Sequence, residues 1–255
     1  MAFSGRVALV TGAASGMGRL ACRRLADAGA RVAAVDVNQE GLLETAAGKD
    51  AIRAYPLDVT DSRAAGELVT QIESELGPLD RVVNAAAIMP TGFLLDQDVH
   101  LVSRIMDINY GGTVNLTLAA LPGMLERGRG DLVNFASVAG WSPSLHFGAY
   151  NASKFAVVAF TEVLFHENQK RGVRIVCVCP PPVNTPLLDQ AKSKPKMLEQ
   201  MGKPIDPDVV LDAIEDGLEA GRLFVFPGRG TAFGVLLRRW FPGLLWRIVH
   251  RTEGR

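Results

Sequence analysis

The sequence lacks the features that mark nucleic-acid-binding, membrane-spanning and secreted proteins. Its 255 residues carry 27 basic and 27 acidic side chains, so the net charge of zero indicates no nucleic-acid partner. No run of about 18 uncharged apolar residues is present, which argues against a spanning helix. The first predicted strand begins almost at the N-terminus, so we expect no signal peptide and a cytoplasmic location.

Cysteine is scarce as well. Cys22, Cys177 and Cys179 are too few for a disulfide framework, and we interpret all three as small buried apolar residues. Cys177 and Cys179 fall in one predicted strand, where we expect them to face opposite sides. We therefore predict neither a C-x-x-C site nor a metal site.

Short apolar runs alternate with helical periodicities along the chain. Apolar residues make up 48% of it, enough for the core of one large domain. Because β and α segments alternate, we predict a single-domain, Rossmann-like α/β fold, a doubly wound parallel sheet with helices on both faces. The predicted strands are 6–10, 31–35, 51–57, 79–85, 131–136, 173–179 and 223–226, and the predicted helices are 17–28, 38–47, 62–76, 97–126, 150–170 and 206–220.

A glycine-rich loop follows the first predicted strand. Gly12, Gly16 and Gly18 lie between that strand and a helical pattern. This order is the context of a dinucleotide site, because glycines let the backbone approach a pyrophosphate at a helix N-terminus. A tight turn without a ligand is the alternative. We favour binding because a second strand and an acidic residue follow.

That acidic residue is Asp36, at the end of the second predicted strand. A carboxylate there can accept hydrogen bonds from both hydroxyls of an adenosine ribose, and it would repel a 2′-phosphate. Val37 follows it rather than an arginine, and Arg19 is the one nearby cation. The pattern favours NAD over NADP.

Tyr150 and Lys154 are spaced for acid/base chemistry. Residues four apart share one helix face, and an ammonium beside a phenol stabilises the phenolate. We therefore expect Lys154 to lower the Tyr150 pKa from about 10 towards neutrality. Y-x-x-x-K alone occurs by chance, and Ser137 could simply cap a strand end. With Ser137 thirteen residues before Tyr150, we favour catalysis by all three.

Together these features resemble the short-chain dehydrogenase/reductase (SDR) family over roughly residues 4–228. The family pattern T-G-x-x-x-G-x-G is met by Thr11, Gly12, Gly16 and Gly18, and P-G-x-V-x-T is similar to 180–185. The resemblance implies that the catalytic residues are Ser137, Tyr150, Lys154 and Asn109. It implies cofactor contacts from Gly12, Ser15, Gly16, Met17, Gly18, Asp36, Asp58, Val59, Asn84, Ala85, Ala86, Tyr150, Lys154, Pro180, Val183 and Thr185.

The chain departs from two family motifs. N-N-A-G is Asn84-Ala85-Ala86-Ala87 here, which adds a methyl group near the cofactor and removes one polar side chain. The glycine of P-G is Pro181, which fixes φ and lacks an N–H. The nicotinamide contacts are the ones that these changes put in doubt.

The resemblance implies reversible hydride transfer between a secondary alcohol or ketone and NAD(H). Tyr150 would exchange the hydroxyl proton, and Ser137 would hold the substrate oxygen. Lys154 would hold the nicotinamide ribose. Asn109 would interrupt a helix and hold a water that links Lys154 to solvent. For Asp58 we weigh two roles equally: a cofactor contact and a residue that only forms a turn.

The apolar residues of the C-terminal tail, described next, indicate a lipophilic substrate that is steroid-like, terpenoid or long-chain. We expect 186–204 to form an amphipathic lid over the site, and we interpret His146 as a loop or packing residue. The predicted cavity lining is Met89, Phe93, Trp141, Leu145 and Phe147.

The C-terminal tail is basic and apolar. Residues 1–228 form the predicted NAD-binding domain, and 229–255 form an extension that Pro242-Gly243 splits into two short helices. We expect the extension to pack on the domain, on a second subunit or on a membrane surface through 229–251. Apolar residues nearly all round 150–170 predict a homodimer or homotetramer through this helix and 97–126.

Two other functions fit parts of the pattern. One is an NAD-binding regulatory protein without turnover, which the changes at Ala85, Ala87 and Pro181 leave open. The other is a sugar-nucleotide epimerase with the same Tyr/Lys chemistry. That group has a different glycine spacing and a larger C-terminal domain than this tail provides.

Overall fold

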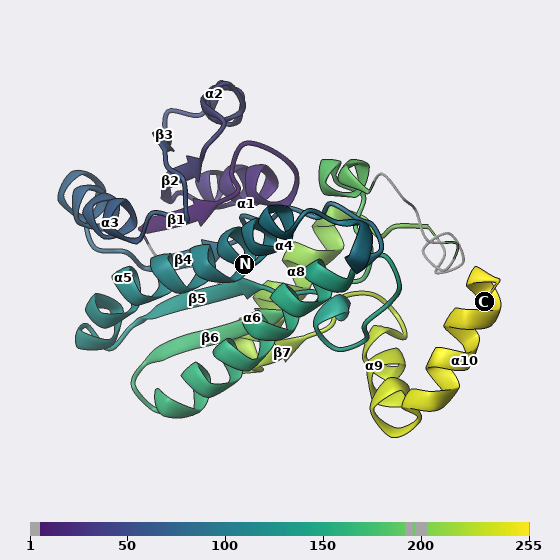
Figure 1. The fold of residues 1–255 in the computed structure, drawn as a ribbon. Helices are drawn as coiled ribbons and strands as arrows, with labels where there is room; N and C mark the ends of the chain where they lie inside the picture. Colours follow the sequence, from purple (N-terminus) through teal and green to yellow (C-terminus); the bar gives the residue numbers. More distant parts are fainter. Residues whose placement is uncertain (1–5, 192–195, 197–202, 255) are drawn as a thin grey trace.

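A twisted sheet of parallel strands forms the centre of the molecule (Figure 1). The computed structural model describes residues 6–191, 196 and 203–254. Within them the sheet has seven strands in the order β3-β2-β1-β4-β5-β6-β7. The strands are β1 (Val7–Thr11), β2 (Arg31–Asp36), β3 (Ile52–Pro56), β4 (Arg81–Asn84), β5 (Gly130–Phe135), β6 (Val173–Val178) and β7 (Phe224–Val225). The predicted parallel sheet is confirmed.

Strand β1 shows why these runs form buried strands. Val7 and Leu9 pack on one face of the sheet, while Ala8 and Val10 pack on the other. Successive side chains of a strand point to opposite faces, so a strand covered on both sides needs apolar residues at every position.

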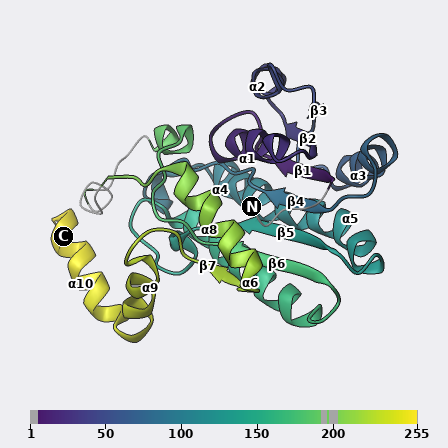
Figure 2. The same cartoon turned by 180° about the vertical axis from the view of Figure 1, so that it is seen from behind.

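Helices cover both faces of the sheet, as predicted. Figure 2 shows α1 and α8 on one face, and Figure 1 shows α4, α5 and α6 on the other. The face of α1 and α8 also receives α2, and the opposite face receives α3. Their bounds are α1 (Gly16–Asp27), α2 (Gln39–Ala46), α3 (Ser62–Leu76), α4 (Val99–Met106), α5 (Gly112–Glu126), α6 (Gly148–Glu167) and α8 (Pro207–Glu219).

The region predicted as one helix over 97–126 is interrupted. A π-helical turn, Asp107–Gly111, joins α4 to α5 and contains Asn109. Such a turn inserts a residue into the helical ladder and is frequent at functional sites. The expected interruption at Asn109 is present.

The strand order places a crevice between β1 and β4. From β1 the chain proceeds to β2 and β3 on one side, and β4 begins the other side. Loops that leave the carboxyl ends of β1 and β4 therefore diverge, and ligands of such sheets bind in the crevice between them. The glycine loop follows β1, and Ala85-Ala86 follows β4.

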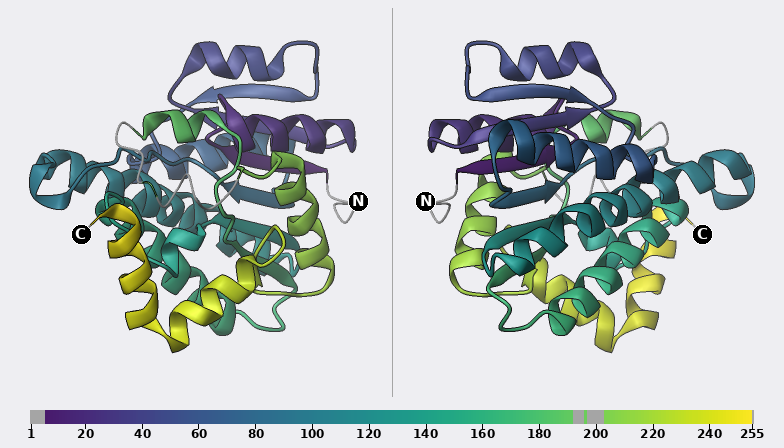
Figure 3. Two further views of the ribbon diagram at one scale, coloured as in Figure 1. Left: turned by 90° about the vertical axis from the view of Figure 1, so that its right-hand side faces the viewer. Right: turned by 90° about the vertical axis from the view of Figure 1, so that its left-hand side faces the viewer.

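The C-terminal residues form two helices, α9 (Thr231–Trp240) and α10 (Pro242–Glu253). Pro242 starts α10, so the predicted split is confirmed. The two helices form an arm at one side of the molecule (Figures 1 and 3). In the part of the chain that the structure describes, no helix is both long and apolar enough to cross a membrane.

The predicted orientation of Cys177 and Cys179 is wrong. Their sulfur atoms lie 3.9 Å apart on the same side of the chain. Residues two apart in an extended strand share a face, so opposite orientation was never compatible with their spacing. All three cysteines are free and buried, as expected.

A buried ion-pair network joins the sheet to α8. Arg81 on β4 is 3% exposed; its Nη2 lies 2.7 Å from the Asp131 carboxylate, and it also pairs with Glu215 of α8. Arg174 on β6 pairs with the other oxygen of Asp131, at 2.6 Å. Removing one member of a buried network leaves the remaining charges poorly compensated.

Replacing Arg81 is therefore expected to destabilise the protein. We expect Arg81→Ala to lower the free energy of unfolding by about 3 kcal/mol or more, because the buried Asp131 and the partly buried Glu215 both lose Arg81 as a partner. The exposed Arg63–Glu67 pair supplies the control, and Arg63→Ala is expected to change it by less than about 0.5 kcal/mol. Urea unfolding followed by circular dichroism measures both. Equal effects would contradict a stabilising role of the network.

Candidate active site

The glycine loop is held against the end of β4 by Thr11. The Thr11 hydroxyl accepts hydrogen bonds from the N–H groups of Ala85 and Ala86, at 3.0 and 3.1 Å. Gly12 has φ +67°, and a Cβ there would come within 2.8 Å of the Ala85 carbonyl oxygen. A Cβ at Gly18 would lie 2.1 Å from the Gly12 oxygen. Both positions therefore require glycine.

The loop ends at the N-terminus of α1, where donors are available to a ligand. Ser15 precedes the helix, and its side chain caps none of the backbone N–H groups. The first N–H groups of a helix have no partner within the helix and attract phosphate. This close-packed loop with open helix donors fits a dinucleotide pyrophosphate.

Asp36 ends β2 beside the loop. Its carboxylate accepts hydrogen bonds from Ala14 N at 3.1 Å and from Asn38 N at 2.9 Å, so its position is set from both sides. Arg19 is already engaged elsewhere. It pairs with Glu44 at 2.7 Å and donates to the Thr45 hydroxyl at 3.0 Å. Arg19 would have to break these contacts to reach a 2′-phosphate.

Asp58 follows β3, and its surroundings fit both a turn former and a cofactor contact. Its carboxylate accepts from the Thr60 N–H at 3.0 Å and from the Thr60 hydroxyl at 2.8 Å, as a turn former does. These bonds lower the Asp58 pKa, and the charge of Arg104 adds to the effect. Asp58 and Val59 also line the cavity described below.

Ser137 lies two residues after the end of β5 and immediately precedes the short 3₁₀ turn Val138–Gly140. Its Oγ accepts from Ala139 N at 3.1 Å, so it does cap this turn. A Cβ at Gly140 would lie 2.6 Å from the Lys154 carbonyl oxygen. The missing side chain lets the turn pack directly on α6, which brings Ser137 towards the helix that carries Tyr150.

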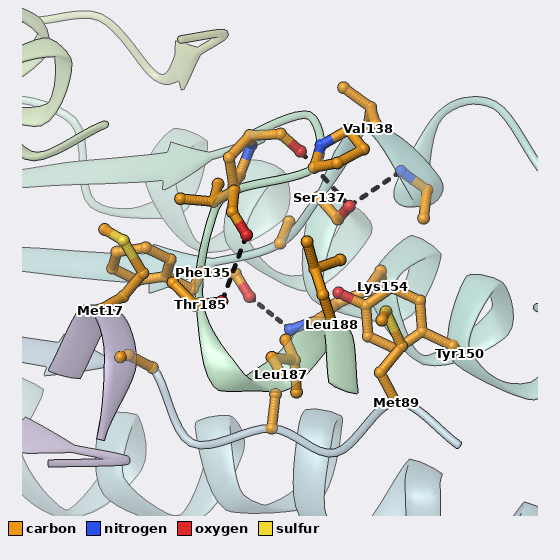
Figure 4. A pocket seen from close by; sticks show the side chains of 18 of the residues that line it. Met17, Met89, Phe135, Ser137, Val138, Tyr150, Lys154, Thr185, Leu187 and Leu188 are labelled. Carbon is orange, nitrogen blue, oxygen red and sulfur yellow. Dashed lines mark hydrogen bonds between the residues drawn. The ribbon is translucent and has the colours of Figure 1, made fainter. Parts of the chain in front are cut away.

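Tyr150 and Lys154 lie one turn apart on α6, both buried. Lys154 Nζ is 5.7 Å from the centre of the Tyr150 ring and donates to the Phe135 carbonyl oxygen at 2.7 Å (Figure 4). That bond ties α6 to the end of β5. The two side chains are thus positioned by the sheet as well as by the helix.

The expected direction of the Tyr150 pKa is not found. Burial raises the pKa of Tyr150 to about 12, and hydrogen bonding with Ser137 only partly opposes this. Burial also lowers the pKa of Lys154 to about 8. Removal from water penalises whichever form is charged, so burial shifts both groups towards their neutral forms.

Asn109 holds two segments together from the π turn. Its Oδ1 accepts from Ile88 N at 2.8 Å, and its Nδ2 donates to Ile88 O and Ser153 Oγ, both at 3.0 Å. Ser153 in turn donates to the Tyr150 carbonyl oxygen at 2.8 Å. Asn109 thus positions both α6 and the chain after β4. Its expected water-mediated link to Lys154 stays a prediction.

One cavity of about 750 Å³ joins the glycine loop to Ser137, Tyr150 and Lys154. Met17 lies at its glycine-loop side, and Met89 and Tyr150 lie opposite (Figure 4). The sequence-predicted residues that line it are Gly12, Ser15, Gly16, Met17, Gly18, Asp36, Asp58, Val59, Ala85, Ala86, Ser137, Tyr150, Lys154, Pro180, Val183 and Thr185.

Asn84 and Asn109 do not line the cavity, and the predicted cofactor contact of the Asn84 side chain needs correction. Its side chain points into the protein, where Nδ2 donates to Thr117 Oγ1 at 3.0 Å and to Asn134 Oδ1 at 2.9 Å. As the last residue of β4 it follows the strand alternation into the interior. The two departures from the family motifs, Ala87 and Pro181, do line the cavity.

The predicted substrate lining is partly wrong. Met89 and Phe147 line the cavity, but Phe93, Trp141 and Leu145 do not. Trp141 packs instead on Phe224, with ring centres 4.9 Å apart.

Phe93 packs against His146, with ring centres 4.1 Å apart. The packing interpretation of His146 therefore agrees with its position, although its backbone has the unusual φ of +67°.

Other cavity residues had no signal in the sequence. Gln190 is one: its Oε1 accepts from Met89 N at 2.8 Å and so connects the 186–190 segment to the chain after β4. Ser142 and Ser144, before α6, line the cavity as well. Only the folded chain brings these residues together.

The expected lid is only partly within the described residues. Its beginning, Pro186–Gln190, is a 3₁₀ helix, and Leu187 and Leu188 of this turn line the cavity. Residues 192–195 and 197–202 lie outside the described part of the chain, so the amphipathic helix stays a prediction.

A family model described as short chain dehydrogenase matches residues 6–196, most of the chain. This protein belongs to the short-chain dehydrogenase family. An uncharacterized oxidoreductase of Staphylococcus aureus (strain MW2) is 32% identical over 211 residues, which cover 82% of this chain and 89% of the relative. A 2-dehydro-3-deoxy-L-rhamnonate dehydrogenase (NAD(+)) of Sphingomonas sp. (strain SKA58) is 36% identical over 189 residues, which cover 74% of this chain and 76% of that relative.

Solved structures of short-chain dehydrogenases agree with the fold. One from Burkholderia phymatum in complex with NAD matches with a TM-score of 0.85 and 25% identity over 96% of both chains. A 3-ketoacyl-(acyl-carrier-protein) reductase from Brucella melitensis complexed with NADH matches with a TM-score of 0.80 and 28% identity. That match covers 88% of this chain and 98% of the reductase.

The pKa shifts of this dehydrogenase predict how its stability depends on pH. Between about pH 8 and 10.5, the unfolded lysine binds a proton that folded Lys154 has lost, so the free energy of unfolding rises with pH. Between pH 10 and about 12, folded Tyr150 keeps a proton that the unfolded phenol loses, so the free energy of unfolding falls again.

Urea unfolding of the unliganded protein across this pH range tests both shifts. Lys154→Met is expected to remove the rise above pH 8, because the variant has no amine to titrate at this position. Lys170→Met, at an exposed position, is the control and should keep the rise. A rise of the same size in Lys154→Met would show that another group causes it.

Proposed function

We propose that this short-chain dehydrogenase interconverts a secondary alcohol and a ketone with NAD(H) as cofactor. The observation that carries the proposal is the single cavity that contains the glycine loop and Asp36 together with Ser137, Tyr150 and Lys154. Bound NAD(H) would accept or supply the hydride, and the protein would position the reactants and handle the proton.

Tyr150 is the proton-transfer group of this proposal. Burial keeps its phenol protonated in the unliganded protein, which suits donation to a carbonyl oxygen during reduction. Ser137 would hydrogen-bond the same oxygen as it gains negative charge. Lys154, whose pKa of about 8 lies near neutrality, would hold the ribose hydroxyls and balance charge beside Tyr150.

NAD is the preferred cofactor of the proposal. Asp36 lies beside the loop with its carboxylate held by Ala14 and Asn38. A 2′-phosphate there would meet a like charge, and Arg19 is paired with Glu44 rather than free to compensate. The relatives found with NAD or NADH in their names support the same cofactor.

The substrate side of the cavity is apolar. Met89, Phe147 and Tyr150 form a buried cluster, and Leu187 and Leu188 pack against it. Removing apolar substrate surface from water against such a wall favours binding. We therefore propose a lipophilic alcohol or ketone. The regulatory alternative is weaker, because a protein without turnover has no need of Ser137, Tyr150 and Lys154 in one cavity.

A homodimer or homotetramer remains part of the proposal. Leu118 on α5 and Phe155 and Val163 on α6 are exposed apolar residues on the two helices expected to form the interface. Light scattering at micromolar concentration decides between monomer and oligomer.

Tyr150→Phe tests the chemistry. It is expected to lower turnover of lipophilic secondary alcohols by about 10²- to 10⁴-fold, because the acid/base group is lost while the ring stays. NADH absorbance measures turnover, and calorimetry should show that the variant still binds NAD. Tyr55→Phe is the matched control, since the Tyr55 hydroxyl donates to Glu75 and Tyr55 lies outside the cavity. Equal activity of Tyr150→Phe and the unchanged protein would contradict the mechanism.

Asp36→Asn tests cofactor choice. The amide of the variant has the same size but no charge, and its one oxygen can accept from either Ala14 N or Asn38 N, whereas the carboxylate accepts from both. We expect the preference for NAD over NADP to fall by about tenfold or more, because the like-charge contact is removed. Calorimetric titration with both cofactors measures it. Glu40→Gln, an exposed acid on α2, should leave the preference unchanged. Tighter binding of NADP by the unchanged protein would overturn the role of Asp36.

A further inference from the structure

The arm formed by α9 and α10 exposes large apolar side chains to solvent. Phe233 is 69% exposed, Leu236 54% and Trp240 74%. Phe241, Leu244 and Ile248 continue the exposed series into α10. Positions three and four apart share a helix face, so 233, 236, 237 and 240 form one stripe on α9. Exposed apolar surface of this extent marks a docking surface.

The same arm is strongly basic. From Arg222 to the C-terminus the chain has seven arginines and one glutamate, without lysine or aspartate. Since the net charge of the chain is zero, the rest of the protein carries a matching excess of negative charge. Four arginines lie in α9 and α10, and none makes an ion pair with a described residue: Arg238, Arg239, Arg247 and Arg251.

The inner side of the arm belongs to the active-site cavity. Val235 of α9 and Leu245 of α10 line the cavity that contains Tyr150. Val235 is buried, whereas its neighbours Leu236 and Leu237 are exposed. The two helices thus have one face towards the cavity and one face towards solvent. Figure 3 shows the pair at the margin of the molecule.

We propose that the outer face of α9 and α10 binds the surface of an anionic lipid membrane. Leu and Trp side chains would enter the boundary between headgroups and acyl chains, and arginines would contact the negative headgroups. Trp is favoured at that boundary. Because the opposite face lines the cavity, a docked protein would hold its substrate site next to the lipid. That last step rests on the proposed function; the docking does not.

A second copy of the chain fits the same face less well. Two copies related by a two-fold axis would bring identical patches together. Arg239 and Arg247 of one copy would then lie against the same basic helices of the other, and like charges at an interface are unfavourable. An anionic membrane supplies both the apolar layer and the opposite charge.

Vesicle sedimentation tests the proposal. We expect the unchanged full-length protein to bind vesicles rich in phosphatidylglycerol and not vesicles of pure phosphatidylcholine, and to be released by high salt. Arg239→Gln with Arg247→Gln should weaken the partition coefficient by about 30-fold, since each basic residue near an anionic surface contributes about a factor of five. Arg63→Gln, an exposed arginine on α3, should leave it unchanged.

A matched pair of leucines tests the apolar part. Leu236 and Leu43 are 54% and 60% exposed, both on helices. Leu236→Gln should weaken vesicle binding by about tenfold, whereas Leu43→Gln should not change it. Circular dichroism and NAD calorimetry confirm that each variant is folded.

Two outcomes would overturn the proposal. One is the absence of binding to anionic vesicles. The other is a loss of oligomer in Leu236→Gln by light scattering, without vesicle binding by the unchanged protein, which would assign the face to a second copy. Vesicle binding without turnover of any alcohol would contradict the proposed function and leave the docking intact.

Discussion

The common direction of the seven strands is the constraint on which the site depends. Because all strands are parallel, their carboxyl ends meet at one edge of the sheet, and the loops from β1, β2, β4, β5 and β6 converge there. Two side chains then fix the loop and the helix in place. Thr11 ties the glycine loop to the end of β4, and Lys154 ties α6 to the end of β5. The glycine loop and the Tyr150–Lys154 pair, which are far apart in the chain, therefore share one cavity.

Burial governs the chemistry of that cavity before a ligand enters. It raises the pKa of Tyr150 and lowers that of Lys154, so both groups are shifted towards their neutral forms. Tyr150 near neutral pH is thus an acid, and its conversion to a base requires a change in charge or solvation beside it. The hydrogen bond with Ser137 and the nearby Lys154 amine are the groups through which such a change would act.

The arm of α9 and α10 extends the same cavity to the outer surface. Its inner residues Val235 and Leu245 line the cavity that Met89 and Phe147 also line. Its outer residues carry the exposed apolar stripe and arginines that form no ion pair with any described residue. The proposed lipophilic substrate and the proposed membrane docking are consistent with each other, because a lipophilic compound is concentrated in membranes rather than in water.

Local patterns in the sequence were sufficient for the fold and for much of the site. Alternating β and α periodicities, the glycines after β1 and the spacing of Tyr150 and Lys154 are short-range features, and each depends on residues within about one element. Residues that act over long range were not predictable in this way. Three features depend on packing between distant segments: Asn84 points inward, Arg19 pairs with Glu44, and Trp141 packs on Phe224 outside the cavity. The sequence by itself therefore determined the sheet, the loop and the identity of the reactive groups. Only the tertiary structure decided their pKa values and which neighbours face the cavity, because burial is a property of the packed chain and not of any one segment.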